Sequence, residues 1–128
     1  MGVGHRDLKV WQRAMDLAEL VYQQTGAFPP AEAYGLTAQM RRAAVSIPSN
    51  LAEGHGRGGK EYGRYADIAY GSLLELETQA ELAIRLGYIS PDSAVPLLAA
   101  ISEVGRMLNG LRGAIRRGQT ARHNHPDP

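Results

Sequence analysis

Residues that could do chemistry are few in this chain, and the spacing of its histidines and carboxylates argues against catalysis. The histidines lie outside the predicted helices, at His5, His55, His123 and His125. A di-iron site in a helical bundle needs Glu-x-x-His pairs on two helices, and the sequence contains none. His123 and His125 are two residues apart and could form a weak metal-binding site, although a plain polar tail is the simpler interpretation. With no cysteine for thiolate chemistry, we expect no enzyme activity, no cofactor and no metal site.

Anion binding is the other chemistry that the residue types allow. The segment from Gly54 to Lys60 reads GHGRGGK, and four glycines in six residues predict a break between helices. Arg57 and Lys60, beside glycine amides at the start of a helix, would suit a phosphate. The segment lacks the Gly-Lys-Ser or Gly-Lys-Thr of a P-loop. A plain helix–helix connection with left-handed glycines is the simpler interpretation.

Positive side chains mark the candidate contacts to RNA or DNA. Net charge is only +1, so no strong overall field attracts nucleic acid. From Gly105 to the end, however, the chain holds five arginines and one acid, Asp127. In a second interpretation, Arg41 and Arg42 form ion pairs with acidic residues on the third helix of a neighbouring subunit. The predicted nucleic-acid contacts are Arg41, Arg42, Arg57, Lys60, Arg116 and Arg117.

Hydropathy predicts a cytoplasmic protein with no membrane partner. No segment approaches the ~20 apolar residues that span a bilayer. The N-terminal MGVGHRDLKVWQ also lacks the apolar core of a signal peptide.

Four helical segments must position these residues. The third segment carries the clearest apolar seam, and we expect Leu73 and Leu76 in the core. In the first, Leu8, Trp11, Met15, Ala18 and Tyr22 form one apolar face of a helix. We expect Trp11 of this face in the core or in a subunit contact, and Asp7 is a candidate N-cap. We predict helices over about residues 8–24, 36–53, 60–86 and 93–117.

Prolines and a mid-helix glycine mark the irregular points. At Pro48 the second helix either kinks or restarts at Ser49 or Asn50, and the long apolar stripe favours a kink. Ser93 as N-cap would place Pro96 in the first turn, where its missing N–H is harmless. Gly71 predicts a close approach of another backbone or a slight bend.

Length and helix order predict one all-α domain of 128 residues. We expect an antiparallel up-down-up-down four-helix bundle over residues 1–117 and a disordered tail over 118–128. Much of the apolar content is alanine, so the core of one copy is modest and association with other copies would enlarge it.

Most of the chain resembles a known bacterial family. The stretches DLKVWQRAMDLAELVY, FPPAEAYGLTAQMRRAAVSIPSNLAEGHGRG and YADIAYGSLLELETQAELAIRLGYI are similar to 23S rRNA intervening-sequence proteins. The resemblance implies a four-helix up-down bundle that assembles as a ring-like homopentamer, with no established enzyme activity. Some members are encoded inside insertions in large-subunit rRNA genes. A related accessory protein of retroelements works with a reverse transcriptase and nucleic acid.

This chain departs from the family pattern at a few positions. Tyr62 and Tyr65 stand where the family often has Phe, and Leu51 stands where it often has Ile. The net charge of +1 also lacks the strongly basic excess of the retroelement protein. Two functions therefore stay open: a self-assembling bundle that binds nucleic acid or acts as a scaffold, and a protein-interaction module that binds no nucleic acid. The salt dependence of binding distinguishes the two functions, because nucleic-acid binding falls steeply as ionic strength rises.

Overall fold

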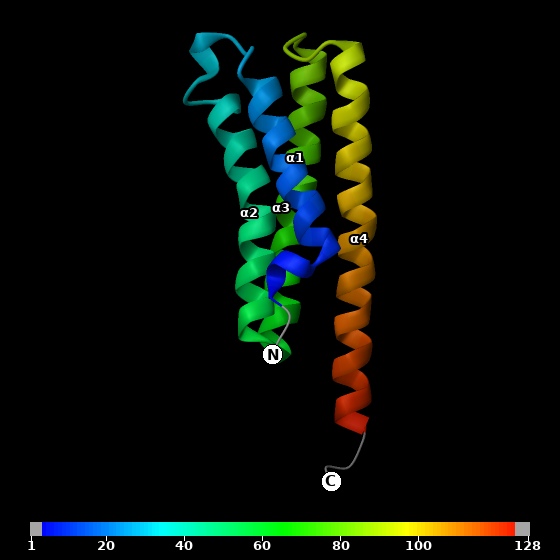
Figure 1. Ribbon diagram of the computed structural model, residues 1–128. Helices are drawn as coiled ribbons and strands as arrows, with labels where there is room; N and C mark the ends of the chain where they lie inside the picture. Colours follow the sequence, from blue (N-terminus) through cyan, green and yellow to red (C-terminus); the bar gives the residue numbers. More distant parts are fainter. Residues whose placement is uncertain (1–3, 125–128) are drawn as a thin grey trace.

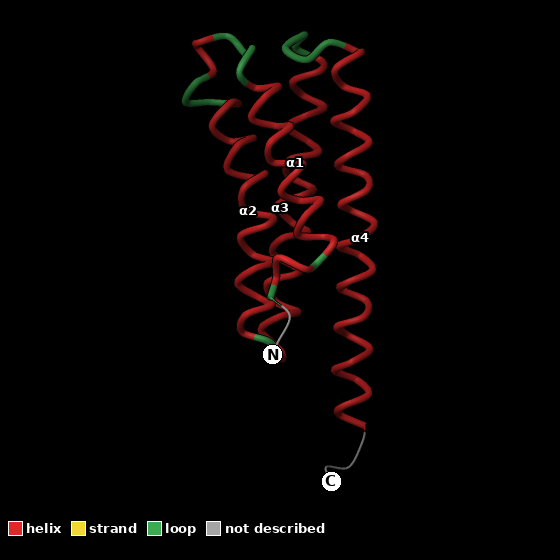
Figure 2. The backbone as a smooth tube through the Cα atoms, viewed as in Figure 1, coloured by secondary structure: helices red, strands yellow, loops and turns green. Residues whose placement is uncertain are grey.

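The computed structural model describes the chain from residue 4 to residue 124, with side chains as far as residue 118, and this part is all helical (Figures 1 and 2). Two short 3-10 turns, η1 (His5–Asp7) and η2 (Pro30–Glu32), accompany four α-helices. The connections lie at alternate ends of the bundle, α1–α2 and α3–α4 at one end and α2–α3 at the other (Figure 1). The helices are α1 (Lys9–Thr25), α2 (Leu36–Arg57), α3 (Gly59–Arg85) and α4 (Pro91–Asn124).

Each helix packs against two others. Helix α1 contacts α2 and α4, and α3 contacts the same two helices. The helices differ in length: α1 has 17 residues and α4 has 34, which is about 26 Å against about 51 Å at 1.5 Å per residue. The last part of α4 therefore extends beyond α1 (Figure 1).

The core confirms the predicted seam of α3. Leu73 and Leu76 are buried there, and four alanines complete the buried face of this helix. Small side chains let the neighbouring helices approach closely, so the larger residues of α1, α2 and α4 fill the centre. The largest fully buried side chains are Leu17, Val21, Met40, Ile47, Leu51, Leu76, Leu97, Val104 and Leu108.

The predicted apolar face of α1 is partly buried, because Ala18 lies in the core and Leu8 and Trp11 pack against it. Met15 is 41% exposed and Tyr22 is 45% exposed, whereas Leu17 and Val21 fill the core. Both faces of α1 carry apolar side chains at helical spacing, so periodicity alone does not distinguish them. The predicted Asp7 cap is wrong, because the N-cap position is Leu8 and no side chain caps it.

Helix α2 runs unbroken through Pro48, so a restart at Ser49 or Asn50 is wrong. The Asn50 side chain points back along the helix: its Nδ2 donates to the Ser46 carbonyl at 2.8 Å and to Ser46 Oγ at 2.9 Å. Asn50 therefore does not begin a new helix. Ser46 Oγ also lies 2.8 Å from Ser72 Oγ, which links α2 to α3.

The predicted glycine loop from Gly54 to Lys60 is mostly helical. Gly54 and Gly56 belong to α2, and the turn is made by Gly58 and Gly59, whose φ angles are +70° and +56°. Gly54 is buried, and a Cβ at this position would lie 2.7 Å from Tyr65 Cβ. This glycine therefore permits close packing of α2 on α3, which outweighs its low helix propensity.

Helix α3 ends at Arg85, one residue before the predicted end, but α4 begins earlier than predicted. Gly87 has φ +78°, its amide donates to Ile84 O at 3.0 Å, and the Tyr88 amide donates to Ala83 O at 2.9 Å. This pair of hydrogen bonds is the Schellman motif.

Helix α4 has Ser90 rather than Ser93 at its cap. The Ser93 amide donates to Ser90 Oγ at 3.2 Å, and Pro91 takes the first helical position, which proline favours. Pro96 consequently lies inside the helix. The helix continues to Asn124 rather than ending near residue 117. The end of the predicted tail, residues 125–128, lies outside the described residues, and disorder over 118–128 stays a prediction.

Candidate nucleic-acid interface

A cleft rich in cations lies near the α2–α3 end of the bundle, between the first turns of α3 and the second half of α4. Its volume is about 280 Å³. Four cations and one carboxylate line it, so the cleft is positive although the whole chain is nearly neutral. The lining residues are Lys60, Gly63, Arg64, Asp67, Arg112, Ile115 and Arg116.

Helix geometry brings the four cations together. Lys60 and Arg64 are four residues apart on α3, and Arg112 and Arg116 are four residues apart on α4. Side chains at this spacing lie one above the other on one helix face. Because α3 packs against α4, the two pairs face one cleft.

Arg112 is the fixed member of the set. Its Nε donates to Asp67 Oδ1 at 2.8 Å and its Nη1 donates to Asn109 Oδ1 at 3.0 Å. The guanidinium also lies over the Tyr70 ring, 4.3 Å from the centroid, and the side chain is only 24% exposed. A cation held on three sides loses little rotamer freedom when it meets an anion.

Lys60 and Arg116 are the available cations. Both are exposed, and among the described side chains neither has a hydrogen-bond or ion-pair partner. Arg64 is less available than these two, because it pairs with Glu61 at 3.3 Å and lies over the Tyr65 ring at 5.1 Å. The cleft thus combines one preset guanidinium with two side chains free to close on a ligand.

Arg57 lies at the end of α2 and does not line the cleft. It pairs with Glu53, its Nη2 2.9 Å from Glu53 Oε2, and lies over the Tyr65 ring at 5.4 Å. The Glu53 hydrogen bond raises the Arg57 pKa, so the charge stays but is already partly compensated. Lys60, which the sequence paired with Arg57, belongs instead with the α4 arginines.

Arg41 and Arg42 do not line the cleft, and they differ in their contacts. Arg41 joins α2 to the end of α1: its Nε donates to Thr25 Oγ1 at 2.9 Å and its Nη2 donates to the Tyr22 carbonyl at 3.3 Å. The guanidinium lies 4.5 Å from the Tyr22 ring centroid. Arg42 is exposed and has no ion-pair partner in the described part of the chain. Arg117 is exposed beside Gly113, outside the cleft lining.

Sequence reasoning missed Arg64 and Arg112. A usable signal was present, because each is four residues from a predicted cation on the same helix. The Asp67–Arg112 pair joins residues 45 apart, which no local pattern reveals.

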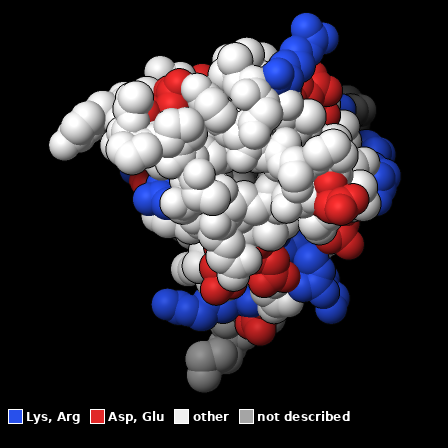
Figure 3. Space-filling model, turned by 90° about the horizontal axis from the view of Figure 1, so that it is seen from above, with Lys and Arg blue, Asp and Glu red and all other residues white. Residues whose placement is uncertain are grey.

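The opposite end of the bundle is different in character. Viewed from that end, charged side chains lie around the periphery of a mostly uncharged surface (Figure 3).

Within residues 4–124, no group of three or more potential ligands is arranged to hold a metal ion. In the same part, none of the helices has the length and apolarity that crossing a bilayer requires.

Fold and site together define a small all-helical protein with a basic cleft between two helices and no metal-binding group among the described residues. Residues 6–110 match the family model described as the 23S rRNA-intervening sequence protein. The chain belongs to this family, which confirms the resemblance seen in its sequence. No curated protein matches the chain. Arg112 and Arg116 lie beyond residue 110, so the α4 side of the cleft falls outside the matched region.

Proposed function

We propose that this protein is a non-enzymatic, self-assembling bundle that binds nucleic-acid phosphates in its basic cleft. The antiparallel up-down-up-down chain would form a ring-like homopentamer in the bacterial cytoplasm. The observation that carries the binding proposal is the cleft with four cations, of which Lys60 and Arg116 have no partner among the described side chains.

Phosphodiester oxygens fit the chemistry of this cleft. Arg112 already has two of its donors engaged, so it offers its remaining face as a fixed positive charge. Lys60 and Arg116 can reach a phosphate from α3 and α4 without breaking an ion pair. Such contacts position a nucleic acid without reading its bases, so we expect affinity with little sequence preference.

Assembly would make a weak site useful. One subunit offers two unpaired cations in the cleft, and each phosphate neutralised adds only about 0.7–0.9 to the salt slope. Copies of the cleft repeated around a ring would raise overall binding by avidity, provided that one nucleic acid spans several subunits. We therefore expect longer structured RNA or duplex DNA to bind more tightly than short fragments.

Fluorescence anisotropy across a salt series tests this proposal. Labelled structured RNA and labelled duplex DNA should bind the wild type with a steep salt dependence, and Lys60→Ala combined with Arg116→Ala should flatten it. The matched control is Lys9→Ala with Arg106→Ala, which removes two exposed positive charges from α1 and α4 outside the cleft. Equal loss in both double variants would show that net charge, rather than the cleft, causes binding.

A module that binds a protein and no nucleic acid is the second candidate. It is favoured by apolar side chains exposed on α1 and α2, Met15, Tyr22 and Val45. If the wild type binds neither RNA nor DNA at low salt, the nucleic-acid proposal fails and this candidate takes its place.

A further inference from the structure

We infer that the outer face of α3 in one copy docks into an apolar groove between α1 and α2 of the next copy. This inference rests on the proposed self-assembly and names the two surfaces that would make it. Each surface is exposed in the single chain, and each is more apolar than a solvent-facing helix surface requires.

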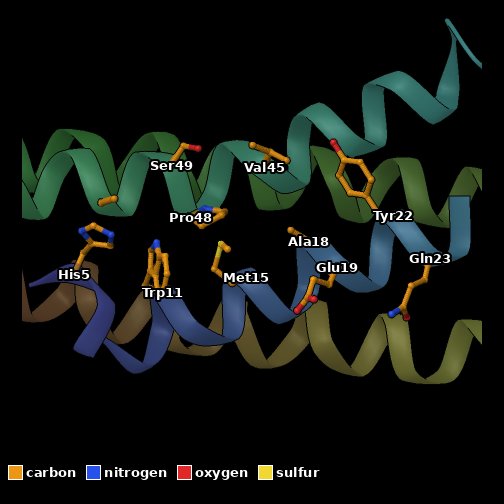
Figure 4. Close-up of a pocket in the computed structure, with 11 residues that line it drawn as sticks. His5, Trp11, Met15, Ala18, Glu19, Tyr22, Gln23, Val45, Pro48 and Ser49 are labelled. Atoms are coloured by element: carbon orange, nitrogen blue, oxygen red, sulfur yellow. The ribbon is translucent and has the colours of Figure 1, made fainter. Parts of the chain in front are cut away.

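The receiving surface is a groove of about 610 Å³ between α1 and α2 (Figure 4). Its α1 wall carries the predicted apolar stripe, of which the chain itself leaves Met15 and Tyr22 exposed. Most of the lining is apolar, with polar atoms at the ends and rim (Figure 4). The lining residues are His5, Trp11, Met15, Ala18, Glu19, Tyr22, Gln23, Val45, Pro48, Ser49 and Ala52.

The inserting surface is the side of α3 opposite its buried seam, which we call the outer stripe. It consists of Ile68, Gly71, Leu74, Thr78, Leu82 and Leu86, all exposed. The four large members are 40–50% exposed. Their spacing of threes and fours is that of a helix-packing face, so α3 has two such faces instead of one. A helix with one packing face would be polar on this side.

Gly71 supports this assignment. The sequence predicts close packing or a bend at this glycine, yet a Cβ there would meet nothing within 4 Å in its own chain. No other part of its own chain therefore makes the predicted close approach. A glycine in the middle of a helix costs about 1 kcal/mol relative to alanine, so its place on the outer stripe suits a close approach from outside.

Shape and length of the two surfaces are compatible. The groove follows α1 from Trp11 to Tyr22, about 17 Å at 1.5 Å per residue. The outer stripe runs from Ile68 to Leu86, about 27 Å by the same rise, so three of its turns fill the groove. A concave surface on one side and a convex stripe on another cannot pair with themselves, which makes the contact heterologous and lets it close into a ring.

Charges beside the two surfaces are complementary. Glu75, Glu77 and Glu81 are exposed on α3, and none has an ion-pair partner in the part of the chain that the structure describes. The groove continues past Tyr22 and Val45 into a hollow lined by Arg41 and Arg42. Arg42 has no ion-pair partner among the described residues, so it is placed to meet a glutamate of the inserted helix. This is the charge match that favours a second copy over an unrelated partner.

One substitution on each surface tests the inference. Val45→Glu places a charge in the groove and Leu82→Glu places one in the outer stripe. Both residues are more than 40% exposed, so the fold of one chain should survive. Val95→Glu on α4 is the matched control, because Val95 is 69% exposed but belongs to neither surface. Circular dichroism reports folding, and light scattering after size exclusion reports mass.

The wild type and Val95→Glu should assemble equally, whereas each surface variant should fall to the 13.9 kDa single chain. Mixing the two surface variants should give a dimer of about 28 kDa and nothing larger, because only one intact groove and one intact stripe remain. If Val45→Glu does not fold, Met15→Glu replaces it in the groove.

The two proposals fail in distinguishable ways. A wild type that assembles while both surface variants keep its mass would overturn the surface assignment alone. Surface variants that fall apart but do not complement each other in the mixture would likewise overturn the heterologous pairing. A wild type that stays a single chain at micromolar concentration would overturn the proposed self-assembly and this inference with it.

Discussion

Gly54 offers the sharpest test of the packing between α2 and α3. Gly54→Ala adds one methyl group, whose carbon would lie 2.7 Å from Tyr65 Cβ and 3.3 Å from Tyr62 Cδ1. Tyr65 Cβ is fixed to the α3 backbone and cannot rotate away. The two helices must therefore move apart by about 0.7 Å, the difference between 2.7 Å and an ordinary contact of 3.4 Å. Gly56→Ala is the matched change, because a Cβ at Gly56 meets nothing within 4 Å.

Two opposing effects set the size of the result. Alanine in place of a helical glycine stabilises by up to about 1 kcal/mol, and both positions share this gain because both belong to α2. Overpacking costs about 1–3 kcal/mol and falls on Gly54 alone. We expect Gly56→Ala to stabilise by up to about 1 kcal/mol and Gly54→Ala to be about 1–3 kcal/mol less stable than Gly56→Ala.

Urea unfolding followed by far-ultraviolet circular dichroism measures both variants. All proteins must be compared at one concentration, because self-association adds to stability. A destabilised Gly56→Ala would show that its backbone is not helical, as the glycine-loop interpretation of the sequence expects. Equal stability of the two variants would refute the close approach of α2 and α3 at Gly54.

Three further outcomes follow from buried, capping and titrating groups. Leu76→Ala should lower the free energy of unfolding by about 2–5 kcal/mol, because Leu76 is fully buried, and an unchanged urea midpoint would contradict its place in the core. Ser90→Ala should cost about 1 kcal/mol by removing the cap of α4, whereas Ser93→Ala should be nearly neutral in the same titration. The hydrogen bond to Glu32, at 2.9 Å, raises the pKa of Tyr88, so its stabilisation is complete below pH 10 and is lost above it. Thermal melts between pH 9 and 11 should therefore fall more steeply for the wild type than for Tyr88→Phe, and parallel curves would refute this linkage.

The seam of α3 could be predicted from sequence because its alanines and leucines form one continuous row that its own chain covers. Leu73 and Leu76 are buried as expected. The start of α4 was missed because two capping serines lie three residues apart, and avoiding an internal proline favoured the wrong one. In the structure Pro96 is inside the helix, so the Ser90 cap and Pro91 outweigh the lost hydrogen bond.

The cations on each helix of the basic cleft could be predicted from sequence, but the pairing of the two helices could not. Cations four residues apart on one helix can be read directly, which would have added Arg64 to Lys60 and Arg112 to Arg116. Which helix faces which cannot be read in this way, because it depends on packing between segments far apart in the chain. The Asp67–Arg112 ion pair and the Arg112–Tyr70 contact arise only when α3 and α4 come together.

The exposed part of the apolar stripe on α1 bears on assembly. Periodicity reports every apolar face that a helix carries, whichever molecule covers it. Met15 and Tyr22 belong to a regular stripe and are exposed, whereas Trp11 of the same stripe is partly buried against the core of its own bundle. A stripe that is apolar, regular and left exposed is the pattern of a face covered by a partner. The same reasoning applies to Gly71, whose predicted neighbour is missing from its own chain.

Both surfaces would then be used at once in the proposed ring, while the cleft stays open. Lys60, Arg64, Arg112 and Arg116 lie on α3 and α4 and share no residue with the α1–α2 groove. On α3, the cleft uses the first turns, and the outer stripe begins at Ile68. Leu82→Glu should therefore abolish assembly and lower the apparent affinity for long nucleic acid, while a short fragment that contacts one cleft should bind the single chain as it binds the assembly. Equal loss for short and long ligands would show that the cleft is not complete within one copy.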